Sequence, residues 1–316
     1  MLSSLSSLLH LYLQFGGGLF IGFLLKPQLP PSTPVIIGRF LYWFGVPVSI
    51  LAFLRHTPLT ESLWIAPLVA WGAMGFALFL GWLWIHFLGL RFTPTPLNHP
   101  TIGSFLLASM VGNTGYLGYP ICFALVGHDY LGWILFYDLL GNTIGSYGLG
   151  VLLATHYGYG VTRLFPLTMN LIKNPTLWSL GISVSIQSIP FPRSIDIILL
   201  ACGWGSIALS VILIGMRLGQ RSFIKNVQLV RTSLIIKMLL VPMVLGIGLK
   251  LTNLSGLTQL TLILQSAMPP AFATVVIAEL YDLDRDFAVT TLTLGTLTLV
   301  VTLPLWLLLF STNELW

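Results

Sequence analysis

The sequence predicts an all-α protein that crosses a membrane many times, and three observations support this fold class. Only 7% of the 316 residues are charged while 56% are apolar, whereas soluble domains carry about 25% charged residues. Apolar runs of roughly 20 residues, each long enough to cross a bilayer as a helix, recur along the whole chain. Two of these runs are interrupted by glycine or proline at corresponding places in the two halves of the chain.

The apolar runs define ten candidate spans, which are separated by short loops. The spans are 5–25, 35–54, 63–88, 102–126, 130–155, 175–189, 195–216, 229–251, 257–281 and 287–310. Ten spans divide into five plus five, and a unit with an odd number of spans is inserted upside down when it is duplicated. We therefore expect two inverted five-helix repeats, formed by residues 1–157 and 158–316.

The basic residues of the loops predict the orientation. If the loops are assigned alternately to the two sides, one side receives Lys26, Arg39, Arg91, Arg163, Lys173, Arg217, Arg221, Lys225, Arg231 and Arg285. The other side receives Arg55, Arg193 and Lys250. Because basic loops stay in the cytoplasm, we expect both termini on the extracytoplasmic side of a plasma (inner) membrane. This topology also explains the net charge of +5, so no nucleic-acid partner is expected.

Two spans are broken near their middle. In the fourth span, residues 112–120 read GNTGYLGYP, and these glycines and the proline are incompatible with an ordinary helix. In the ninth span Pro269 and Pro270 are adjacent, and a proline disfavours the α conformation of the residue before it. The opened backbone needs protein, water or a ligand as a partner, since lipid cannot provide hydrogen bonds. Two proline kinks that serve only packing are the alternative.

We expect the two breaks to form a substrate site. The candidate residues lie within or beside the breaks: Asn113, Thr114, Gly115, Tyr116, Pro120, Gln265, Met268, Pro269 and Pro270. The N-termini of half-helices carry partial positive charge, and we expect them after Pro120 and Pro269, because proline suits a first helical turn. Such a site favours an anion such as a carboxylate. We expect the amides of Asn113 and Gln265 to hold it, without a cationic side chain.

Two ionisable side chains are predicted near the middle of the membrane, Asp138 in the fifth span and Lys237 in the eighth. Asn142 lies one helical turn after Asp138, on the same face. Charges inside a membrane are costly, and they mark ion or proton pathways or pair with each other. Asp138, Asn142 and Lys237 are therefore candidates for proton or ion coupling. A structural ion pair is the alternative, as is a Lys237 stem that ties down the broken backbone. The histidines lack ligand spacing, so neither a metal nor a cofactor is expected.

These motifs resemble the auxin efflux carrier family, which includes the PIN-type auxin transporters and bacterial malate and malonate permeases. The resemblance covers essentially the whole chain and rests on Gly112–Pro120, on the span with Lys237 and Pro242, on Gln265–Pro270 and on Asn174-Pro175. It implies the fold of sodium/proton antiporters and bile-acid symporters, in which two crossing broken helices form the site of an elevator-type carrier. Spans 1, 2, 6 and 7 would then be the scaffold, and spans 3–5 and 8–10 the transport domain.

The resemblance further implies a secondary transporter that exports or permeates a small organic anion, auxin-like or a dicarboxylate. The lipid bilayer and a second copy of the chain are the further expected partners. Auxin itself is not implied, because the long cytoplasmic loop of plant PIN carriers is missing here. The alternatives are a sodium-coupled organic-anion symporter of the bile-acid type, a channel and an intramembrane enzyme. For an enzyme, Asp138 would lack the second midplane aspartate of an aspartyl protease, and the sequence has no His-Glu-x-x-His motif.

Overall fold

The computed structural model describes residues 13, 16–55, 57, 59–89, 97–160, 173–218, 227–252 and 254–310. Within these ranges the regular structure is helical, apart from one isolated antiparallel bridge between Gly112 and Pro270. Five of the described helices are long and apolar enough to cross a membrane: Thr33–Leu54, Glu61–Phe87, Arg193–Arg217, Val227–Lys250 and Arg285–Phe310. The protein is thus an all-α membrane protein, as the sequence predicts.

The helices of the first half lie within or close to the predicted spans. Residues 16–25 are helical and belong to the first predicted span, whose earlier part lies outside the described residues. The α-helices that follow are α2 (Thr33–Phe40), α3 (Val46–Leu54), α4 (Ile65–Leu83), α6 (His99–Met110), α7 (Tyr119–Val126), α8 (Leu131–Phe136) and α9 (Val151–Tyr159). Wider π-helical turns interrupt or extend them at η2 (Leu41–Gly45), η4 (Trp84–Gly89), η5 (Thr114–Gly118), η7 (Tyr137–Thr143) and η8 (Ser146–Gly150). Short 3₁₀ turns are η1 (Lys26–Gln28), η3 (Glu61–Trp64) and η6 (His128–Tyr130).

The first described helix of the second half is short. Helix α11 (Pro175–Ser185) is capped by the Asn174 side chain, which accepts a hydrogen bond from the Thr176 N–H at 3.0 Å. The remaining elements are α12 (Arg193–Leu218), α13 (Val227–Ile235), the π-helical η9 (Ile236–Leu240), α14 (Val241–Lys250), α15 (Gly256–Ser266), α16 (Phe272–Leu280) and α17 (Arg285–Phe310). The fourth and ninth predicted spans are each split, into α6 and α7 and into α15 and α16.

Proline explains several of the π-helical turns. The segments η2, η5 and η9 each end two residues before a proline: Pro47, Pro120 and Pro242. A proline has no N–H for the carbonyl one turn earlier, and a wider turn relieves the resulting mismatch. At Pro120 that carbonyl belongs to Tyr116, and it accepts a hydrogen bond from the Ser210 hydroxyl of α12 at 3.4 Å. A proline within a span therefore produces a local widening without ending the helix.

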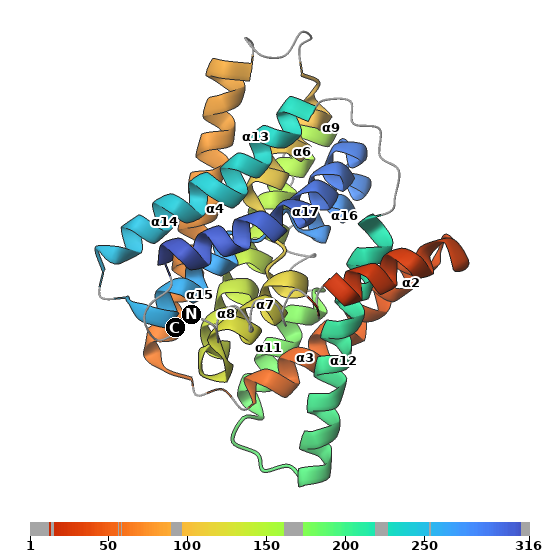
Figure 1. The fold of residues 1–316 in the computed structure, drawn as a ribbon, viewed down its shortest axis with the longest axis vertical. Helices are drawn as coiled ribbons and strands as arrows, with labels where there is room; N and C mark the ends of the chain where they lie inside the picture. Colours follow the sequence, from red (N-terminus) through yellow and green to blue (C-terminus); the bar gives the residue numbers. More distant parts are fainter. Residues whose placement is uncertain are drawn as a thin grey trace.

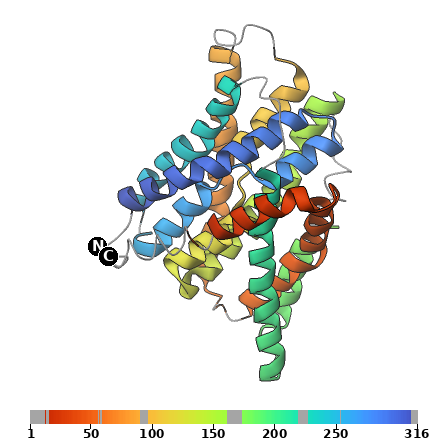
Figure 2. The same cartoon turned by 45° about the vertical axis from the view of Figure 1, so that its right-hand side comes forward.

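Two groups of helices lie side by side. Helix α3 packs against α11 and α12, and Figures 1 and 2 show these three with α2 gathered on one side of the molecule. On the other side, α4 packs against α6 and η7, and α6 also contacts α9, α13 and α17. The surface carries large apolar side chains, among them Val301 and Leu308, each 73% exposed. Such a surface suits contact with lipid tails rather than with water.

Candidate functional site

The two helix breaks meet in the interior of the protein. Residues 111–113, between α6 and η5, lie antiparallel to residues 269–271, between α15 and α16. The Asn113 N–H donates to the Pro269 carbonyl at 2.7 Å, and the Ala271 N–H donates to the Val111 carbonyl at 3.1 Å. Each break thus satisfies backbone groups of the other, which lipid could not do. Local glycine and proline residues interrupt both helices, and the tertiary fold pairs the two interrupted segments.

Lys237 secures this crossing from η9. Its side chain is buried, and Nζ donates to the Ser266 carbonyl, at the C-terminal end of α15, at 3.0 Å. A cation at a helix C-terminus is favourable because the carbonyls there carry partial negative charge. A Cβ atom at Gly112 would lie 3.0 Å from both Cε and Nζ of Lys237. Glycine at residue 112 therefore leaves room for this close approach, and Lys237 ties down the broken backbone.

Asn142 of η7 forms hydrogen bonds with the backbone of the same break. Its Oδ1 accepts from the Gly112 N–H at 3.2 Å, and its Nδ2 donates to the Gly112 carbonyl at 2.8 Å. The same Nδ2 lies 2.7 Å from the Thr114 hydroxyl. The side-chain amide therefore pairs with the open backbone much as a neighbouring strand would.

Asp138 is buried one turn before Asn142, and its carboxylate accepts hydrogen bonds from two hydroxyl groups. Thr114 donates to Oδ1, and Tyr119 donates to Oδ2 at 2.6 Å. The ion pairs of the described residues are Arg55–Asp196 and Arg285–Glu279, so no cation pairs with Asp138 there. The structural pair of Asp138 with Lys237, an alternative raised by the sequence, is not formed, because Lys237 contacts Ser266 instead.

A small polar cavity lies beside the crossing. Its volume is about 100 Å³. It is lined by Tyr42, Val46, Gly112, Asn113, Thr114, Gly115, Tyr116, Asp138, Asn142, Thr143, Ser146, Tyr147, Thr176, Ala271, Phe272 and Ala273. Phe272 and Ala273 form the first turn of α16, where backbone N–H groups have no acceptor within the helix. The Nδ2 atom of Asn113 is buried and has no hydrogen-bond partner. The cavity wall therefore combines free donors with the Asp138 carboxylate.

The structure brings together part of the predicted site. Of the predicted substrate residues, Asn113, Thr114, Gly115 and Tyr116 line the cavity, as do the coupling candidates Asp138 and Asn142. Pro120, Gln265, Met268, Pro269, Pro270 and Lys237 do not line it. Met268, Pro269 and Pro270 contribute backbone at or next to the crossing instead.

Gln265 has an unusual environment. Its side chain is fully buried against η5, and neither amide atom has a hydrogen-bond partner. A Cβ atom at Gly118 would lie 2.5 Å from Gln265 Oε1, so a larger residue there would force the Gln265 side chain to move. An unsatisfied buried amide costs free energy, and its presence at a helix break is the kind of strain that functional sites retain.

Pro120 corrects one expectation. The half-helix was expected to begin after Pro120, but it begins at Thr114, and η5 runs on into α7. Pro120 therefore lies inside a continuous helix, and the break at residues 111–113 precedes it. The physical reason is the wider π turn, which accommodates the proline without opening the backbone. Pro120 lines a separate apolar cavity of about 700 Å³ between α7, α12 and residues 17–21.

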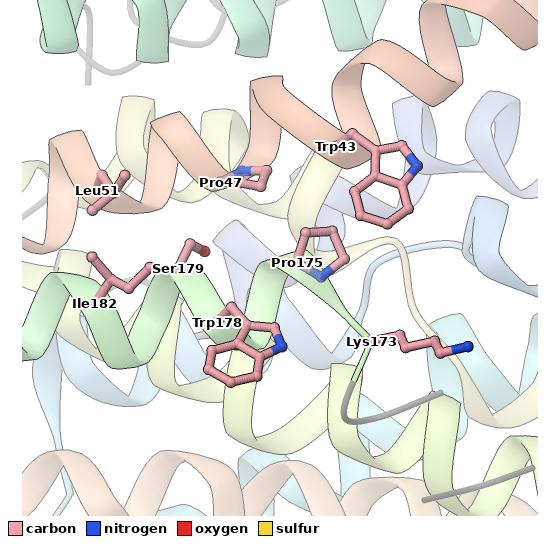
Figure 3. Close-up of a pocket in the computed structure, with 8 residues that line it drawn as sticks. All are labelled: Trp43, Pro47, Leu51, Lys173, Pro175, Trp178, Ser179 and Ile182. Atoms are coloured by element: carbon pink, nitrogen blue, oxygen red, sulfur yellow. The ribbon is translucent and has the colours of Figure 1, made fainter. Parts of the chain in front are cut away.

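A third cavity, of about 540 Å³, lies on the outer face of the helices that border the polar one. Figure 3 shows its apolar side chains, with Trp43, Pro47 and Leu51 on one helix facing Pro175, Trp178 and Ile182 on α11. The residues next to these in sequence, Tyr42, Val46 and Thr176, line the polar cavity. The η2–α3 helix and the start of α11 thus separate a polar interior from an apolar surface.

Several cavity residues were not predicted from the sequence. Ser146 and Tyr147 follow Asn142 by about one helical turn, so the face shared by Asp138 and Asn142 could have indicated Ser146. Tyr42 and Thr176 belong to distant helices, and no local pattern marks them. Their position depends on how α11 packs against η2 and η7.

The fold and this site define the class as a membrane transporter: an all-α membrane protein in which two broken helices cross beside a polar cavity. Residues 161–307 match the sequence model of a family described as Membrane transport protein. The chain is 25% identical to an uncharacterized transporter of Methanocaldococcus jannaschii over 215 residues, which are 66% of this chain and 69% of that protein. It is 28% identical to an uncharacterized transporter of Methanothermobacter thermautotrophicus over 230 residues, 72% of each. Both comparisons thus indicate similarity to membrane transporters.

Proposed function

We propose that the chain is a secondary carrier that moves a small organic anion across the plasma (inner) membrane and binds it at the crossing of the two broken helices. The observation that carries this proposal is the buried Nδ2 of Asn113, which lines the cavity without an acceptor. The first turn of α16 lines the same cavity and adds N–H groups at the positive end of a helix dipole. These donors suit a carboxylate.

The size of the cavity favours a small substrate. Its volume is about 100 Å³, whereas pockets that enclose drug-sized ligands measure about 300–1,000 Å³. A dicarboxylate with a few carbon atoms fits this space better than an aromatic acid with two rings. Malonate and malate are therefore the first compounds to test, and indole-3-acetate is the larger comparison.

The position of the cavity supports an elevator-type mechanism. Tyr42, Val46 and Thr176 belong to the group of α2, α3, α11 and α12, and the other lining residues belong to the second group. A site between two packed groups can open toward either side of the membrane when one group moves against the other. We assign the first group to the scaffold and the second to the transport domain, within an inverted repeat of residues 1–157 and 158–316.

Asp138 supports proton coupling. Its carboxylate lines the cavity in which we place the anion, and two negative charges in one small cavity repel each other. The anion therefore binds more favourably when Asp138 carries a proton. Proton and substrate would bind together and cross in the same direction.

A sodium-coupled symporter is the second candidate, and Gln265 is the observation that favours it. Gln265 Oε1 is buried and accepts no hydrogen bond, and hard cations prefer such oxygen ligands. Malonate flux measured with and without sodium at fixed pH would separate the two candidates. A requirement for sodium would support the second, and a requirement for a pH gradient the first.

Counterflow of labelled malonate and malate in proteoliposomes tests the proposal. We expect saturable counterflow, which a channel would not give. Asn113→Ala should weaken binding by about 1–3 kcal/mol, the range for an unmade hydrogen bond to a charged group. Asn98→Ala is the matched control, because Asn98 caps α6 outside the cavity and accepts from the Thr101 N–H. An Asn113→Ala protein that binds and transports like the wild type would place the site elsewhere.

A further inference from the structure

Arg217 contacts a residue that lines the cavity, and it forms no ion pair within the described part of the chain. The residue is near the C-terminal end of α12, and its guanidinium carbon lies 3.5 Å from the centroid of the Phe272 ring. Phe272 is the first residue of α16 and lines the polar cavity. The Phe272 ring therefore contacts the Arg217 guanidinium, while the Phe272 backbone belongs to the helix N-terminus at which we place the anion.

The guanidinium is held in place, but only part of its hydrogen-bonding capacity is used. Nη2 donates to the Pro34 carbonyl of α2 at 3.4 Å, and a Cβ atom at Gly38 would lie 3.3 Å from it. Nε is buried and has no partner. Within the described part of the chain no carboxylate pairs with Arg217. A buried N–H of a charged group without an acceptor is costly, so a ligand that supplies the acceptor gains affinity.

Arg55 is a useful comparison for Arg217, because its guanidinium is fully engaged in contacts within the protein. Its guanidinium also lies over an aromatic ring, 3.7 Å from the Phe191 centroid. It pairs with Asp196 at 3.0 Å, and it donates to the carbonyls of Ile186 and Ile189. Both arginines therefore have a ring contact, but of the two only Arg55 forms an ion pair within the described residues.

We propose that Arg217 is a second anion-binding residue, which contacts the carboxylate of the transported anion beside the first turn of α16. The inference rests on the function proposed above and changes one part of it, because the anion is then held by a cationic side chain as well as by amides. Arg217 and Pro34 belong to the scaffold group, and Phe272 belongs to the transport group. The contact with the anion therefore forms only in the arrangement described here, and it is lost when the transport group moves. Arg217 helps to load the site on one side of the membrane and does not hinder release on the other.

Binding of malonate to the purified protein tests this inference, with uncharged malonamide as the control ligand. We expect Arg217→Gln to weaken malonate binding roughly ten-fold or more, because charge-assisted bonds are the strong ones. Arg217→Lys should have an intermediate affinity, since lysine keeps the charge but not the planar fork. Arg193→Gln, which removes an exposed arginine at the other end of α12, should bind like the wild type. Wild-type affinity in Arg217→Gln would overturn the inference and leave the proposed function intact.

A measurement on the unmodified sequence covers the case in which the variants do not fold. Phenylglyoxal reacts with arginine side chains, and malonate should slow its reaction at Arg217 but not at the paired Arg55. Malonamide should protect neither residue. Equal reaction of Arg217 with and without malonate, in protein that binds malonate, would contradict the inference. If the wild-type protein binds none of malonate, malate and indole-3-acetate, both this inference and the proposed anion specificity are wrong.

Discussion

At the scale of single residues, Thr114 links the buried carboxylate to the broken backbone. Its hydroxyl donates to Asp138 Oδ1, and the Gly112 carbonyl lies within 3.4 Å as a second acceptor. If Asp138 binds a proton, its carboxyl group can donate to the Thr114 oxygen, and the Thr114 hydroxyl can turn toward Gly112. A proton on Asp138 would in this way change the hydrogen bonds of the segment that pairs with the second break.

We therefore expect Asp138→Asn to abolish the dependence of malonate uptake on a pH gradient while ligand binding stays detectable. An asparagine has the same shape and can still bond Thr114 and Tyr119, so the protein should fold. Tyr119→Phe is the control, because it removes one hydrogen bond to Asp138 but keeps the titrating group. It should cost about 1 kcal/mol of stability and retain the pH dependence. Unchanged pH dependence in a folded Asp138→Asn protein would make Asp138 a structural residue.

Gln265 gives a second prediction at this scale. Because neither of its amide atoms is bonded, Gln265→Met should raise the free energy of unfolding by about 1 kcal/mol, since methionine fills similar space without an unmet hydrogen bond. Gln259 lies on the same helix and donates to the Gly246 carbonyl at 2.9 Å, so Gln259→Met should lower stability. Chemical unfolding of the two variants in the same detergent measures both effects. A loss of stability in Gln265→Met would show that water or an ion satisfies the amide.

At the scale of elements, the crossing depends on how closely the broken helices approach each other. Lys237 of η9 caps α15, Asn142 of η7 pairs with Gly112, and Gly118 of η5 packs on Gln265 of α15. The contact between Gly118 and Gln265 joins the two halves of the chain, whereas each of the other two lies within one half. The π-helical turns contribute to this packing. They give the side chains of Tyr116 and Lys237 directions that a regular α-helix would not give them.

Gly118→Ala tests this packing. The added Cβ would lie 2.5 Å from Gln265 Oε1, so we expect a loss of about 1–3 kcal/mol in the free energy of unfolding. Shortening the partner should relieve the clash. The Gly118→Ala, Gln265→Ala double variant should therefore lose less free energy of unfolding than the two single variants lose together. Gly75→Ala in α4 is the control, because nothing lies within 4 Å of its added Cβ and alanine favours a helix. Additive effects in the double variant would show that the two elements do not press on each other.

At the scale of the whole molecule, the membrane sets the arrangement. Large exposed apolar side chains cover the surface, while the buried side chains of Asn113, Asp138 and Lys237 lie at or beside helix interruptions. The grouping of α2, α3, α11 and α12 apart from the other helices (Figures 1 and 2) places the polar cavity between two bodies. In the elevator-type mechanism that we propose, a site at this position changes its access when one body moves against the other.

The topology prediction belongs to this scale. A reporter fused after Trp316 should lie outside the cytoplasm, and one inserted in the loop of residues 220–226 should lie inside it, because the basic loops alternate between the two sides. Activity of a compartment-specific reporter, such as a periplasmic phosphatase, measures the location. A cytoplasmic C-terminus would rule out ten spans with this orientation.

The sequence by itself determined the features that depend on neighbouring residues. Its few charges and long apolar runs fixed the class of protein, and its glycines and prolines marked both broken spans. Helical spacing placed Asp138 and Asn142 on one face, and both line the cavity. These features follow from helix geometry and local backbone chemistry, which a single segment contains in full.

The tertiary structure decided which distant segments meet. Pro120 and Gln265 looked equivalent to Asn113 in the sequence, but Pro120 lines another cavity and Gln265 is enclosed between η5 and α15. Lys237 looked like a partner for Asp138 and instead holds Ser266. Arg217 looked like one loop cation among many, yet it stacks on Phe272 beside the site. Each of these outcomes depends on the rotation and packing of helices far apart in the chain, and spacing along a single helix carries no information about that rotation.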